Sequence, residues 1–221
     1  MQTFATPSPV SVVLDIPAGR VQFIAADRAD TTIEIAPVDA SRGRDVKAAE
    51  QITVDHGDGV LRIQAPEARN QYFGQSGSVE ITVWLPTGSR VEATAGAAEL
   101  RTVGRLGDLA FEGAHGVVEL DEADSVRLTV HVADVSVGRL GGPAEISVAK
   151  GDIRIGDAAR GKVTLSTQAG SISVSAAPGV SAALDASTSY GRISNSLRND
   201  GTTQLDIHAT TSYGDISAHS R

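Results

Sequence analysis

The sequence predicts an all-β protein, a β-solenoid of about seven two-strand coils with β-hairpins at its N-terminal end. From about residue 90 a small residue followed by alternating apolar residues recurs with a period of about nineteen residues. Glycine is abundant, with 23 copies, and aromatic residues make up only 4% of the chain. This composition favours strands and tight turns, and a thin core of stacked aliphatic side chains does not need bulky rings.

The repeat contains two interleaved apolar columns whose spacing lengthens toward the C-terminus. Because side chains alternate along a strand, each phrase buries one face, and coils about 4.8 Å apart would stack like residues into ladders. We therefore expect each coil to pair with the next one along the chain, and residues 195–201 to form a protruding loop. The first column is Leu100, Val118, Val135, Ile153, Ile172, Ile193 and Ile216, and the second is Val91, Leu109, Leu128, Ile146, Leu165, Leu184 and Ile207.

Residues 1–90 also alternate apolar and polar residues, but with irregular spacing. We interpret them as antiparallel hairpins that continue or cap the solenoid of residues 91–221, the two parts forming one continuous domain. Residues 45–50 could form one or two helical turns, or a loop. The expected strands are Val10–Ile16, Arg20–Ala25, Thr31–Ala36, Gln51–Val54, Val60–Gln64 and Val79–Leu85.

Charge and composition exclude several classes of function. With 19 basic against 27 acidic residues the net charge is −8, which argues against a nucleic-acid or anionic-membrane binder. The absence of cysteine excludes disulfides, thiol chemistry and cysteine-based zinc sites. The N-terminus shows no leader pattern, and no run approaches the roughly 18–20 apolar residues of a membrane span. We therefore expect a cytoplasmic protein.

Residues 79–91, VEITVWLPTGSRV, followed by recurrent Gly-Asp-Ile phrases, resemble a bacterial domain family of unknown function described as a putative adhesin with β-strand repeats. The resemblance covers nearly the whole chain, and residues 150–156 and 211–217 are the phrases most like it. It implies a β-helix-like, right-handed fold and brings no catalytic residues with it. No leader or anchor pattern and no Arg-Gly-Asp tripeptide are recognised in the sequence, so we expect a chain that differs from a surface adhesin in these respects.

Motifs for catalysis or cofactors are weak. Residues 156–162 match the first seven positions of a phosphate-binding loop, but Val163 replaces the required Ser or Thr and a strand, not a helix, is expected to follow. Asp134 and Asp152 follow the corner residues of neighbouring coils and could hold a calcium ion, although aspartate in such turns usually hydrogen-bonds to its own backbone. The five histidines have no metal-ligand spacing. We predict no enzyme activity, no metal and no cofactor.

Aromatic residues mark the candidate interaction surface. Tyr190 and Tyr213 lie in identical Thr-Ser-Tyr-Gly tetrapeptides 23 residues apart, so their rings should stack on consecutive coils. Such a pair could simply stabilise wide coils, or it could mark an association surface. Tyr72 and Phe73 lie in a polar loop flanked by glycine, which could be a partner-binding tip or a hairpin folded on the core.

The leading functional hypothesis is a non-enzymatic scaffold or protein-interaction module. Solenoids present long flat faces, and the last coil, ending at Arg221, would offer an unpaired strand edge to a protein partner or a second copy. The alternative is a carbohydrate- or ligand-binding protein, or a carbohydrate-active one, that uses a sheet face or the wide C-terminal loops.

Overall fold

The computed structural model describes residues 1–66 and 77–221, and this part of the chain is all-β with one short helix. Its sixteen strands join in a single sheet. The elements are β1 Gln2–Ala5, β2 Ser11–Ala26, β3 Asp30–Pro37, α1 Gly43–Gln51, β4 Thr53–Gly57, β5 Val60–Gln64, β6 Val79–Pro86, β7 Arg90–Val103, β8 Arg105–Leu140, β9 Ala144–Lys150, β10 Ile153–Ala158, β11 Gly161–Ala169, β12 Ile172–Ala176, β13 Ala182–Tyr190, β14 Ile193–Ser196, β15 Leu205–Tyr213 and β16 Ile216–Ser220.

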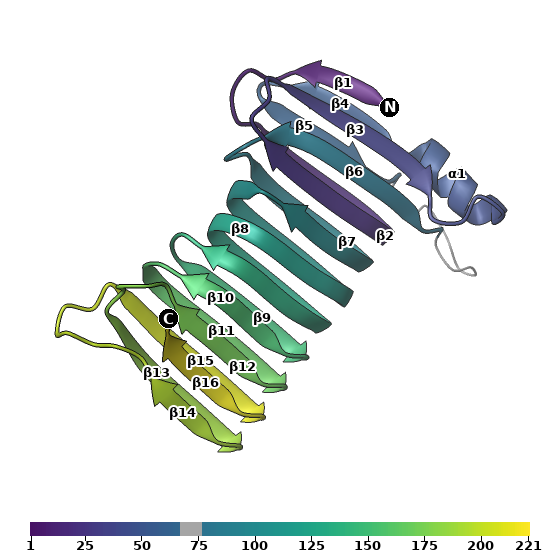
Figure 1. Ribbon diagram of the computed structural model, residues 1–221. Coiled ribbons are helices and arrows are strands. Elements are labelled where there is room, and N and C mark those ends of the chain that lie inside the picture. The colour runs from purple at the N-terminus through teal and green to yellow at the C-terminus, as the bar shows by residue number, and fades with distance from the viewer. Residues whose placement is uncertain (67–76) are drawn as a thin grey trace.

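The strands form a stack of rungs that extends from β1 to β14 (Figure 1). We use "rung" for one passage of the chain through two arms joined at a corner, such as β9 with β10 or β11 with β12. Neighbouring rungs pair in parallel, β9 with β11 and β10 with β12. Alternate residues on each arm point inward, and they join one continuous aliphatic core. A strand this short buries enough apolar surface only because another rung lies on each side of it.

The first apolar column is confirmed wherever it joins separate strands. Ile153 pairs with Val135 and Ile172, and Ile216 pairs with Ile172 and Ile193. The second column is displaced by two residues at its C-terminal end, where Ile207 and Leu184 align with Val163 instead of Leu165. Alternation alone cannot detect this shift, because a displacement of two residues leaves the same side chains facing inward.

The order of the last rungs corrects the expectation that every coil pairs with its successor. β15 pairs with β11 on one side and β13 on the other, and β16 likewise lies between β12 and β14. The C-terminal rung is therefore inserted into the stack, and β13 with β14 forms its end. The loop 197–204 extends from the stack in Figure 1 and carries the chain back to the inserted rung; the protruding loop was expected at residues 195–201, but Asn195 and Ser196 belong to β14. Arg221 closes the arrangement by pairing with Asp157 at 3.0 Å.

The side chains of the two rungs explain their order. The inserted rung points Ala218 into the core, where it is 2% exposed. The register places Asn195 of β14 opposite Ala218, and Asn195 is exposed at the end of the stack. In the inner position Asn195 would be buried between two rungs, where an amide without partners is costly. The more apolar rung therefore occupies the inner position.

The N-terminal region mixes parallel and antiparallel pairing, so the expectation of antiparallel hairpins was incomplete. β1 with β3, β3 with β6 and β4 with β5 are antiparallel. However, β2 runs parallel to β7 along both arms, and it also pairs in parallel with β5 and β6. β5 and β6 thus form a rung outside β2, and the 14-residue segment between them obscured the repeat.

The corner residues bring neighbouring rungs closest together. At Gly170 the backbone has a φ of +156°, and an added Cβ would overlap the carbonyl oxygen of Gly151 on the next rung. Gly214 has the same relation to Gly170, and Gly191 to Gly214. Only glycine permits both this conformation and this approach. The contact between rungs therefore requires glycine at these corners, although Ala98 and Ala133 occupy the corner position of two other rungs.

We predict that Gly170→Ala lowers the free energy of unfolding by at least about 2 kcal/mol, because it adds backbone strain to a steric overlap. Gly57→Ala is the matched control, since nothing lies within 4 Å of its added Cβ, and it should change stability by less than about 0.5 kcal/mol. Urea unfolding followed by circular dichroism measures both. Equal unfolding midpoints for the two variants would contradict the close-packing argument.

Candidate interaction surfaces

A ladder of side chains follows the corner glycines and connects the rungs. Asp134 Oδ1 accepts a hydrogen bond from the backbone N–H of Asp152 at 2.9 Å, and Asp152 Oδ1 accepts one from the N–H of Ser171 at 2.7 Å. Asp215 Oδ1 likewise accepts from the N–H of Arg192 at 2.8 Å. Each carboxylate thus binds the backbone of the following rung in space. The sequence favoured a hydrogen bond from such an aspartate to its own backbone, whereas in the structure the donor is the N–H of the neighbouring rung.

A second ladder, of threonines, supports the same corner from the other side. Thr167 donates to the carbonyl oxygen of Gly151, Thr211 to that of Gly170, and Thr188 to that of Gly214. Both ladders satisfy backbone groups that the tight corner would otherwise leave without partners. In the described part of the chain no cluster of three or more His, Asp or Glu side chains could hold a metal ion. We therefore attribute the Asp and Thr side chains at the corners to stabilisation of the fold.

The residue before each corner forms a third ladder, which includes both predicted tyrosines. Register pairs Val132 with Lys150, Lys150 with Ala169, Ala169 with Tyr213, and Tyr213 with Tyr190. The tyrosine rings are stacked, with centroids 5.0 Å apart and planes 3° from parallel, which confirms the stacking predicted from the tetrapeptides. They remain 67% and 61% exposed. Burial therefore does not account for two adjacent aromatic rings at this corner.

A surface hollow of about 570 Å³ lies beside Tyr213, with Ala169 and Lys150 among its lining residues. Neither Ala169 nor Lys150 was expected from the sequence, because the predicted ladder followed the corner residues and these two precede them. The residues before the corners are Val132, Lys150, Ala169, Tyr190 and Tyr213 in chain order, and only the strand pairing shows that Tyr213 is the neighbour of Ala169.

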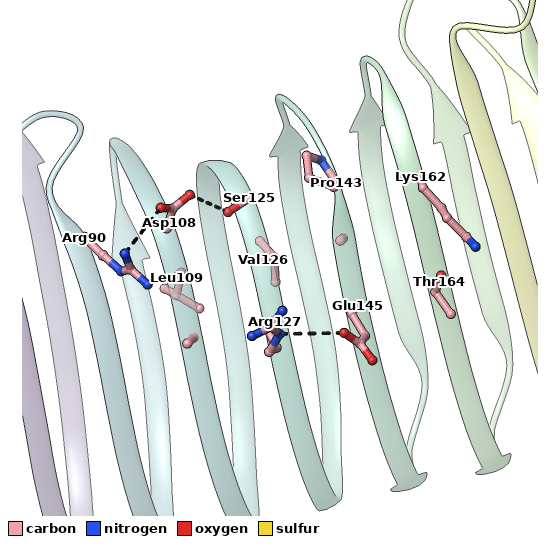
Figure 2. Close-up of a pocket in the computed structure, with 12 residues that line it drawn as sticks. Arg90, Asp108, Leu109, Ser125, Val126, Arg127, Pro143, Glu145, Lys162 and Thr164 are labelled. Carbon is pink, nitrogen blue, oxygen red and sulfur yellow. Dashed lines mark hydrogen bonds and ion pairs between the residues drawn. The ribbon is translucent and has the colours of Figure 1, made fainter.

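A second hollow, of about 550 Å³, crosses the outer face of β7, β8, β9 and β11 (Figure 2). Its charged side chains largely neutralise one another. Arg90 lies 4.0 Å from Asp108, and Arg127 lies 3.6 Å from Glu145. Ser125 also donates to Asp108 at 2.5 Å. Exposed pairs of this kind contribute about 0–1 kcal/mol each. A ligand here would have to compete with these pairs, so this face is a weaker candidate.

The end of the stack is a third surface. Among the residues described, no strand pairs with the outer edge of β13 or β14. Ile193, which belongs to the apolar column, is 47% exposed there because no rung covers it. The start of the edge is covered by the loop 197–204, since the N–H of Ala182 donates to the carbonyl oxygen of Arg198 at 2.9 Å. The rest of β13 is open.

The other sequence candidates fall outside these surfaces. Tyr72 and Phe73 lie outside the described residues. The segment that resembles a phosphate-binding loop runs from β10 into β11, a strand, so it lacks the helix that such a loop requires. His208 lies between Asp206 at 3.1 Å and Asp185 at 3.4 Å, and it connects the two last rungs. No helix within residues 1–66 and 77–221 is long and apolar enough to cross a membrane.

Stacked parallel rungs with paired corner ladders define a repeat-built all-β fold. The Toastrack DUF4097 family matches residues 8–217, and this chain belongs to it. Its function as a family is unknown. No curated protein has a similar sequence.

Two crystal structures show the same fold. One, described as a putative adhesin from Bacteroides fragilis, is 15% identical with a TM-score of 0.57, and the alignment covers 98% of this chain and 95% of that one. Another, a putative adhesin from Parabacteroides distasonis, is 13% identical with a TM-score of 0.50 and the same coverage. At this identity the likeness concerns the fold alone.

The carboxylate ladder predicts a pH dependence at Asp215. The backbone N–H and then the side chain of Arg192 lower the pKa of this carboxyl below its usual value of 3.8. The group therefore stabilises the fold above its unfolded pKa, and this contribution disappears as the pH falls through the folded pKa. Asp215→Asn should be less stable than the wild type at pH 6, and the difference should close below about pH 3.8.

Denaturant unfolding between pH 2 and pH 7 measures this difference. Asp215→Ala separates the two roles of the side chain, because it removes the hydrogen-bond acceptor as well as the charge. Its deficit should persist at low pH. A gap between wild type and Asp215→Asn that does not depend on pH would show that charge plays no part in the ladder.

Proposed function

We propose that this chain is a non-enzymatic protein-interaction module, a β-solenoid that self-associates through the open edge of its end rung. The observation that carries the proposal is the unpaired edge of β13, next to the exposed Ile193. The structures described as putative adhesins agree with a binding role. Strand edges of this kind pair with another strand unless something blocks them.

Backbone alternation determines which groups face the open edge. Just before β13 the carbonyl of Ser181 accepts from the N–H of Leu205 in β15, whereas the N–H of Ala182, the first residue of β13, points away toward Arg198. Because backbone groups alternate in a parallel pair, those of Leu184 and Ala186 should also point away from β15. These residues offer donors and acceptors to a strand of another molecule.

A second copy fits this edge without charge conflict. An antiparallel pair of β13 strands centred on Ala186 places Asp185 of one copy opposite Ser187 of the other. A two-fold arrangement is also closed, so it produces a dimer and not a fibre. Continuing the stack in parallel is disfavoured, because Arg192 occupies the position at which Asp152, Ser171 and Asp215 of the neighbouring rungs accept a hydrogen bond, and a guanidinium cannot accept one.

We predict that the wild-type chain dimerises at high micromolar concentration and that Ala186→Pro weakens dimerisation at least tenfold. Proline removes the N–H that faces the open edge, while the hydrogen bonds of β13 to β15 use the alternate residues. Ala186→Val is the matched control, because it retains the N–H and suits a strand. Sedimentation velocity over a concentration series measures the association.

Circular dichroism should show that both variants keep the β-sheet spectrum. A wild type that remains monomeric at high micromolar concentration would refute self-association, as would equal dimerisation of the Pro and Val variants.

A further inference from the structure

The stack of two tyrosine rings ends at Tyr213, and the hollow at the corner lies beside this ring. One face of Tyr213 is covered by the ring of Tyr190, 5.0 Å away. On the other side register places Ala169, whose side chain is a single methyl group. The hollow of about 570 Å³ lies on this side, with Tyr213, Ala169 and Lys150 in its lining. It exists because a small residue occupies a position that carries a ring on each of the next two rungs.

The spacing of the rungs suits a flat ring in this position. Neighbouring strands lie about 4.8 Å apart, and the two tyrosine rings keep that separation. A ring placed above Ala169 would therefore contact the free face of Tyr213 at the distance that already holds Tyr190. The hollow has the shape of one missing member of an aromatic stack.

The lining determines which kind of ring fits. Gln168, Ser212 and His131 contribute hydrogen-bonding groups to a lining that is otherwise mainly apolar, and Tyr213 is 61% exposed. An aromatic anchor from a protein partner prefers a dry, fully desolvated pocket. A sugar ring has C–H groups that pack on the negative face of an aromatic ring and hydroxyls that bond to a polar rim. The hydrogen-bonding side chains in the lining therefore favour a sugar over an aromatic side chain of a protein partner.

The positive charge of Lys150 narrows the class of ligand further. Lys150 is exposed and forms no ion pair with any residue that the structure describes. Asp152 lies on the same rung as Lys150 and Asp134 on the preceding rung, and each uses one carboxylate oxygen to bind the backbone of the next rung. Lys150 thus provides an ammonium group for a carboxylate or sulfate on the ligand.

We infer that the hollow between Tyr213 and Lys150 binds an acidic sugar chain, with one ring on Tyr213 and its anionic group on Lys150. The site lies on the corner of the stack and does not depend on dimerisation through β13. Ala186→Pro should therefore leave sugar binding unchanged, so the two proposals can fail separately.

Isothermal titration calorimetry tests the site with three probes: tetragalacturonate, its methyl ester and a sulfated galactan tetrasaccharide. The carboxylated and sulfated probes distinguish the two anions, and the ester supplies the same ring without charge. We expect at least one anionic probe to bind at least tenfold more tightly than the ester. Lys150→Gln should remove that preference, and Tyr213→Ala should weaken binding of the anionic probe at least tenfold.

Two further variants keep the test independent of folding. Tyr190→Ala removes a tyrosine of the same ladder that does not line the hollow, so binding should change less than about twofold. Ala169→Tyr should fill the hollow with a third stacked ring, abolish binding and leave the urea midpoint unchanged or raised. Failure of both anionic probes to bind, unchanged binding by Ala169→Tyr, or equal losses for Tyr190→Ala and Tyr213→Ala would overturn the proposal.

Discussion

The close approach of backbones at the corners is the constraint on which the rest of this structure depends. Where Gly170 contacts Gly151, no side chain can intervene, and the rungs lie at the spacing that hydrogen-bonded strands require. This spacing places Asp152 within reach of the N–H of Ser171, and Thr211 within reach of the carbonyl of Gly170. The polar ladders are consequences of the glycine contact, and they stabilise it in turn.

The same constraint produces the surfaces. Because every corner repeats at one spacing, residues at equivalent positions lie directly above one another, and a run of similar residues becomes a continuous feature. Tyr190 and Tyr213 become an exposed stack, and Ala169 becomes a gap in it. A repeat fold can thus change its binding surface by substitution at one position per rung, while the inward residues that hold the fold remain as they are.

The end of the stack has a different chemistry from its interior. The three rungs next to the end rung carry an acceptor after the corner glycine, namely Asp152, Ser171 and Asp215, whereas the end rung carries Arg192. The end rung also replaces the inward alanine with Asn195. These two residues disfavour a further parallel rung. They leave the backbone groups of β13 available for an antiparallel one, because the hydrogen bonds of such a pair do not require a corner ladder.

The sequence alone determined the strand class, the inward columns and the tyrosine stack, because all three follow from local alternation and from a repeat that stacks like residues. Tertiary structure decided the order of the rungs. The phrases at 188–191 and 211–214 are identical, so pattern cannot assign them to inner and end positions. Burial does, since Ala218 tolerates enclosure on both sides and Asn195 does not. The hollow beside Tyr213 depends likewise on Ala169 and Tyr213 being spatial neighbours, although 44 residues separate them in the chain.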